Sequence, residues 1–178
     1  MIDWKNIDIE GLAVHVSAEL KRHNVDAVLV GGACVSIYSH NKYESADLDY
    51  ISHAEVKELE RIMEGIGFHK KSGRHFEHKD CPFFVEFPPP PVAIGKEIPI
   101  TKFNRLKTVV LLTPTDCVKD RLAAYYHWND PQSLEQALMV ALAQKVDMNN
   151  IRKWSKREGA VEKFTRFESL QIRVRRKR

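Results

Sequence analysis

Two aspartates separated by one apolar residue are the segment best suited to chemistry. In Asp47-Leu48-Asp49, the alternation of a β-strand places both carboxylates on one face and Leu48 on the other. Two neighbouring carboxylates repel each other unless a cation or a proton lies between them. Proteins usually hold Mg²⁺ with one or two carboxylates plus substrate phosphates. The segment therefore predicts a site for Mg²⁺ or Mn²⁺ at Asp47 and Asp49.

A third acid is expected on a neighbouring strand. Glu86 lies among apolar residues in Phe84-Val85-Glu86-Phe87, where a carboxylate is costly unless it is paired or bound to a metal. The pattern fits equally well a polar residue that faces outward from an edge strand. In the first interpretation, Glu86 completes a set of three carboxylates.

A pair of glycines supplies the second half of the predicted site. Gly31 and Gly32 follow the apolar run 27–30, which is typical of a buried strand, and a short helix is expected over 33–38. Because the glycines lack side chains, backbone N–H groups at this helix start can approach a phosphate closely. A phosphate-binding turn beside a cation site suits two-metal phosphoryl transfer.

The glycine pair, the short helix and the following Asp-x-Asp strand resemble the signature of the polymerase-β-like nucleotidyltransferase superfamily. The proline-rich segment after Glu86-Phe87 and the sequence Thr113-Pro114-Thr115-Asp116 are similar to a small bacterial branch, some of whose relatives act in toxin–antitoxin or abortive-infection systems. The resemblance covers about residues 25–140. It implies a magnesium-dependent nucleotidyltransferase that binds an NTP such as ATP. The enzyme would move a nucleoside monophosphate to an acceptor hydroxyl on RNA (a tRNA end included), a protein or a small molecule.

The resemblance also implies a role for each residue of the site. It assigns catalysis and metal binding to the three acids and nucleotide binding to four further residues: Asp47, Asp49 and Glu86, then Gly31, Gly32, Ser45 and Lys119. Gly32 stands where the superfamily often has serine, and Glu86 where it usually has aspartate. The alternative function is an inactive binding module of the same fold, such as a toxin–antitoxin component with a protein or RNA partner.

The spacing of apolar residues predicts an α/β (α+β) fold, in which helices flank a mixed sheet and a helical part follows. We expect a helix over 7–21, a second helix with Ser52 as its N-cap, and strands over 27–30, 48–51, 68–76, 83–87 and 107–112. Thr113-Pro114 is typical of a helix start, and helical periodicity continues to about Leu170. The predicted parts are a nucleotidyltransferase domain over 1–112, a helical region over 113–170 and a basic tail over 171–178.

Several other polar groups allow two interpretations each. His75-x-x-His78-x-x-Cys81 fits a zinc site or a solvated hairpin, and the resemblance places this hairpin near the active site. Lys119 fits a salt-bridged helix face or a phosphate contact. The aromatic run 125–128 fits core or a base-stacking platform. The basic residues of 152–157 and 173–178 fit solvated surface or contacts with RNA phosphates.

The composition is that of an ordinary globular protein. The chain has 178 residues, 43% of them hydrophobic, and a net charge of +4. No apolar run reaches the roughly 18–20 residues of a membrane span, and the N-terminus does not resemble a signal peptide. Three widely spaced cysteines predict reduced thiols. We therefore expect a soluble cytoplasmic protein with no membrane partner.

Overall fold

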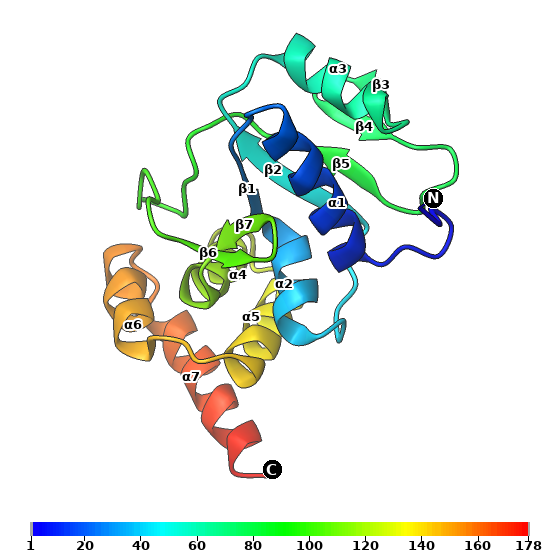
Figure 1. Ribbon diagram of the computed structural model, residues 1–178. Helices are drawn as coiled ribbons and strands as arrows, with labels where there is room; N and C mark the ends of the chain where they lie inside the picture. Colours follow the sequence, from blue (N-terminus) through cyan, green and yellow to red (C-terminus); the bar gives the residue numbers. More distant parts are fainter. Residues whose placement is uncertain (1, 178) are drawn as a thin grey trace.

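The computed structural model describes residues 2–177, and within them seven helices surround a seven-stranded mixed sheet (Figure 1). This confirms the predicted α+β class. The helices are α1 (Ile9–Arg22), α2 (Gly31–Ser39), α3 (Val56–Gly65), α4 (Pro114–Trp128), α5 (Pro131–Ala143), α6 (Met148–Arg157) and α7 (Val161–Arg175). The strands are β1 (Ala27–Val30), β2 (Asp47–Ser52), β3 (His69–Ser72), β4 (His75–Glu77), β5 (Phe84–Glu86), β6 (Phe103–Leu106) and β7 (Val109–Leu112).

The strand order places the predicted site in the middle of the sheet. The order is β3-β4-β5-β2-β1-β7-β6, with β2–β5 and β1–β7 parallel and the other pairs antiparallel. Register pairs Val30 with Asp49 and Asp49 with Glu86. The residue before the glycine pair, the second aspartate and the third acid therefore lie side by side across three strands.

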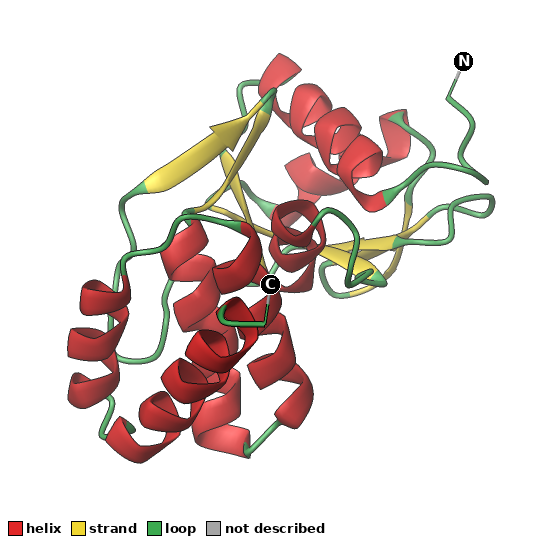
Figure 2. Ribbon diagram, turned by 90° about the horizontal axis from the view of Figure 1, so that it is seen from below, coloured by secondary structure: helices red, strands yellow, loops and turns green. Residues whose placement is uncertain are grey.

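The two faces of the central strands differ in burial. Along β2 the residues alternate between half-buried and buried, so that Leu48 and Tyr50 are inaccessible while Asp47, Asp49 and Ile51 are partly exposed. The buried face packs under α1, where the Tyr50 hydroxyl lies 2.8 Å from Ser17 Oγ. Figure 2 shows the strands between two groups of helices. The alternation that the sequence predicted for Asp47-Leu48-Asp49 is thus confirmed.

Helix α2 joins the sheet to the C-terminal helices. Its residues are buried throughout, and it packs against α1, α4 and α5. The Tyr38 hydroxyl donates to the carbonyl oxygen of Leu112 at 2.6 Å, and Gln144 Nε2 donates to the carbonyl oxygen of Tyr38 at 2.9 Å. The helical region is therefore fixed to the helix that opens at the glycine pair.

Four boundaries differ from the sequence prediction. Residues 68–76 form most of a hairpin, β3–β4, because Gly73 takes a left-handed φ of 50° at its turn. Strand β6 was not expected, and Lys107, with φ 52°, makes the turn to β7. Ser52 ends β2 and donates to the carbonyl oxygen of Asp26, so α3 begins later, with Glu55 as its N-cap. Residues 171–175, expected in the basic tail, belong to α7.

None of the helices within residues 2–177 combines the length and the apolar character that crossing a bilayer requires.

Replacing Leu29 by alanine should lower the free energy of unfolding by about 2–5 kcal/mol, because a fully buried side chain in a central strand leaves a cavity. Urea denaturation followed by circular dichroism measures the change. Ile172→Ala is the control, since that side chain is 44% exposed and should change stability by less than about 0.5 kcal/mol. Equal losses in the two variants would contradict the placement of the core.

Candidate metal centre

The structure brings the three predicted acids together on the partly exposed face of the sheet. One carboxylate oxygen from each of Asp47, Asp49 and Glu86 lies within 4.8 Å of the others. Asp49 and Glu86 are paired across β2 and β5, and Asp47 precedes Asp49 by two residues on the same face. Within residues 2–177 no other group of three or more histidine, cysteine or acidic residues comes this close together.

The electrostatics of the cluster suit a divalent cation. Burial, followed by the charges of Asp47 and Glu86, raises the pKa of Asp49 to about 7, while the charge of Arg121 opposes the shift. Three carboxylates that share a poorly solvated space are unfavourable unless positive charge or a proton offsets their repulsion. Hard oxygen ligands are those preferred by Mg²⁺ and Mn²⁺. The residues present therefore fit such an ion.

Asp47 is oriented by Ser45, which the resemblance assigns to nucleotide binding. Ser45 Oγ donates to Asp47 Oδ1 at 2.8 Å, and the Ser45 N–H donates to Ser36 Oγ at 2.9 Å. The Ser45 side chain is buried. Its hydroxyl is therefore engaged in fixing one oxygen of Asp47.

The glycine pair allows α2 to start directly against the carboxylates. Gly31 has φ 70°, and a Cβ at this position would meet Asp49 Oδ2 at 2.7 Å. A Cβ on Gly32 would meet Ser45 Oγ at 2.6 Å. Both glycines are buried. The missing side chains thus make room for Asp49 and Ser45, and the positive end of the α2 dipole faces the acids.

Glu86 has a partner that the sequence did not reveal. His75 Nδ1 lies 2.7 Å from Glu86 Oε1, and His75 Nε2 lies 3.0 Å from Glu77 Oε1. The hydrogen bond to Glu86 is the main cause of a raised His75 pKa. The His75 ring stacks on Phe84 at 4.6 Å. His75 therefore fixes the position of the third acid.

The possible zinc set is dispersed. His78 packs against Trp4 and Phe68, with ring centroids 4.6 and 5.3 Å away. His75 instead faces Glu86. Within the described chain, His75, His78 and Cys81 do not form a group close enough to share an ion.

The two basic residues of α4 have different surroundings. Lys119 is 2% exposed, and its Nζ donates to Asp116 Oδ1 at 3.0 Å and to Glu97 Oε2 at 3.1 Å. Arg121 donates to Asp120 and is the cation whose charge acts on Asp49. Lys119 is thus held by carboxylates, and its nucleotide contact stays a prediction. The sequence pattern did not indicate that Arg121, whose charge opposes the rise in the pKa of Asp49, belongs to the site.

Comparison with known proteins adds no family: no protein-family model matches the chain, and no curated protein matches it.

In the absence of metal, the free energy of unfolding should fall as the pH rises from 5 to 8. Asp49 ionises near its usual pKa of 3.8 in the unfolded chain, whereas its pKa in the folded chain is about 7. Between these values the unfolded state binds fewer protons, so rising pH favours it. Urea denaturation of the wild type and Asp49→Asn across this range tests the effect. The decline should be steeper in the wild type; identical slopes would contradict the assignment.

Gly31→Ala should destabilise the fold by about 1–3 kcal/mol, because φ is left-handed and a Cβ meets Asp49 Oδ2 at 2.7 Å. The same change should weaken stabilisation by Mn²⁺, since Asp49 must move. Thermal denaturation with and without Mn²⁺ measures both effects. Gly65→Ala is the matched control because a Cβ there meets nothing within 4 Å. A Gly31→Ala protein as stable and as responsive to Mn²⁺ as the control would refute this role.

Proposed function

We propose that this protein is a magnesium-dependent nucleotidyltransferase that moves a nucleoside monophosphate from an NTP to an acceptor hydroxyl. The observation that carries the proposal is the convergence of Asp47, Asp49 and Glu86, whose oxygens lie within 4.8 Å of one another. The buried glycine pair at the start of α2 lies beside them. Carboxylates on adjacent strands next to a glycine-opened helix form the arrangement that the superfamily resemblance implies.

In the proposed reaction, the acceptor oxygen forms a bond to the α-phosphorus. The bond from that phosphorus to the oxygen bridging the α- and β-phosphates breaks, and pyrophosphate leaves. The hydroxyl proton passes to Glu86 or to solvent. The chemistry that Mg²⁺ supplies when held by the three acids is neutralisation of the triphosphate and of the leaving group.

The protein's own residues prepare this site in three ways. Ser45 holds Asp47 through one oxygen, and His75 holds Glu86 through one oxygen. Burial and its neighbours raise the pKa of Asp49, so its ionised form gains most when a cation arrives. Such fixed ligands give the site its geometry before any substrate binds.

One observation favours the alternative of a binding module with this fold. Gly31 and Gly32 are both buried, with Asp49 and Ser45 where their Cβ atoms would lie, so an NTP that contacts the glycine backbone must reach a buried segment. A module that recognises a protein or an RNA, such as a toxin–antitoxin component, requires no such approach. The two functions differ in whether a nucleoside triphosphate binds.

Calorimetric titration of each NTP in the presence of Mg²⁺ tests the proposal. We expect metal-dependent binding of at least one NTP, such as ATP, and its loss in Asp47→Asn/Asp49→Asn, which removes two of the three carboxylates. The control is Glu64→Gln/Glu135→Gln, which removes two exposed acids elsewhere and should bind as the wild type does. If no NTP binds the wild type, the nucleotidyltransferase proposal fails and the binding module is favoured.

A further inference from the structure

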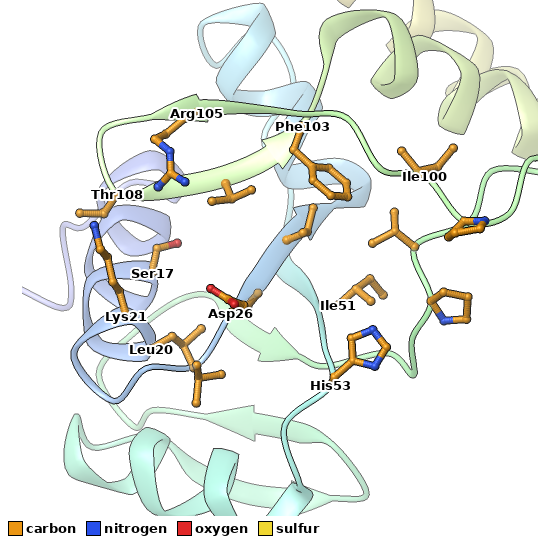
Figure 3. A pocket seen from close by; sticks show the side chains of 17 residues that line it. Ser17, Leu20, Lys21, Asp26, Ile51, His53, Ile100, Phe103, Arg105 and Thr108 are labelled. Carbon is orange, nitrogen blue, oxygen red and sulfur yellow. The ribbon is translucent and has the colours of Figure 1, made fainter.

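A cavity of about 740 Å³ is lined in part by Val28 and Ile51, which lie on the face of the sheet that carries the carboxylates. Figure 3 shows the side chains around it. Its volume lies in the range of small-molecule sites, roughly 300–1,000 Å³. Its lining comes from α1, β1, β2, the β6–β7 hairpin and the loop between β5 and β6. The apolar residues among them include Val28, Ile51, Val92, Ile100, Phe103 and Val110.

The cavity begins one row of side chains from the carboxylates. On β2, Ile51 follows Asp49 by two residues, and on β1, Val28 precedes Val30 by two, so each lies about 7 Å along its strand on the same face. Pro91, which also lines the cavity, follows Glu86 by five residues. The part of the cavity formed by Val28 and Ile51 is therefore adjacent to the three carboxylates.

The cavity and the glycine pair lie on opposite sides of the carboxylates along β1. Going along β1, Val28 comes before the position paired with Asp49, and Gly31 comes after it. An in-line displacement requires the attacking oxygen and the leaving pyrophosphate on opposite sides of the phosphorus. With the triphosphate toward the glycines, the attacking hydroxyl must come from the side of the cavity.

The charged groups of the cavity are not paired with each other or with neighbours. Lys21 and Arg105 reach it from α1 and β6, Asp26 stands at the start of β1, and His53 follows β2 (Figure 3). None of these four side chains forms a salt bridge to another residue of the described chain 2–177. Two permanent cations against one carboxylate give the lining an excess of positive charge.

We propose that this cavity binds the acceptor, and that the acceptor is a small anion with an apolar body. Its ring system or chain lies on Val28 and Ile51, its anionic group pairs with Arg105 and Lys21, and its hydroxyl reaches Asp49 and Glu86. Transfer joins the hydroxyl oxygen to the α-phosphorus of the NTP, releases pyrophosphate and leaves the proton on Glu86 or in solvent. This inference rests on the proposed function.

Three naphthalene compounds of one shape and different charge test the cavity: 2-naphthoate, 2-naphthalenemethanol and 2-naphthylmethylammonium. In calorimetric titrations we expect 2-naphthoate to bind at least about five-fold tighter than the alcohol, as one partly exposed ion pair provides, and the ammonium to bind most weakly. Binding of none of them, or binding without preference for the carboxylate, overturns the inference.

Variants locate the binding. Arg105→Gln should reduce the affinity for 2-naphthoate to that for the alcohol, whereas the exposed control Arg61→Gln on α3 should bind as the wild type does. Val28→Phe fills the floor and should weaken all three compounds by about ten-fold or more, as loss of a well-filled apolar pocket implies. Thermal melts show whether this variant folds; Val110→Phe replaces it if it does not. Unchanged affinities in Arg105→Gln and in the filled variant place the binding elsewhere and refute the site.

The same preparations separate this inference from the proposed function. Binding of Mg²⁺ and NTP without any naphthoate binding leaves the nucleotidyltransferase proposal standing and overturns the cavity. Naphthoate binding without NTP binding overturns the acceptor role. Where both bind, 6-hydroxymethyl-2-naphthoate should be converted to its nucleoside monophosphate ester, detected by mass spectrometry. Transfer to added RNA or protein that 2-naphthoate does not inhibit overturns a small-molecule acceptor.

Discussion

Repulsion among three carboxylates on two adjacent central strands is the constraint on which the rest of the site depends. Burial, together with the charges of Asp47 on the same strand and Glu86 on the next, raises the pKa of Asp49 to about 7. Two features of the fold accommodate this unfavourable cluster. Gly31 lacks the Cβ that would clash with Asp49, and the positive charge of Arg121 on α4 partly offsets the negative charge of the carboxylates. A bound cation would offset this repulsion.

The supports of this cluster come from distant parts of the chain. The β3–β4 hairpin provides His75 to Glu86, and α4 provides Arg121. The buried ammonium of Lys119 joins Asp116 on α4 to Glu97 in the loop between β5 and β6. The loop that walls the cavity is thus fixed to the helical region. The helices act on the site through these contacts and through α2.

One face of the sheet changes in character along its length. The glycine turn and the acids lie at one end of this face. Val28 and Ile51, one row of side chains further along β1 and β2, form the apolar floor of the cavity. Both parts are held by strands in the sheet centre, whose positions are more rigid than those of loops. The proposed transfer of a nucleoside monophosphate from a triphosphate to a less polar acceptor requires both environments within one substrate length.

The sequence by itself determined the local features: the α+β class, the glycine-opened helix, and the common face of Asp47 and Asp49, since strand alternation depends only on chain neighbours. The tertiary structure decided the rest. Only strand register placed Glu86 inside the cluster, although the pattern fitted an outward position equally well. Helix residues two apart point in nearly opposite directions, and only packing showed that Arg121, not Lys119, acts on Asp49. The cavity is lined by segments that lie far apart in the sequence, so no local sequence pattern could have predicted it.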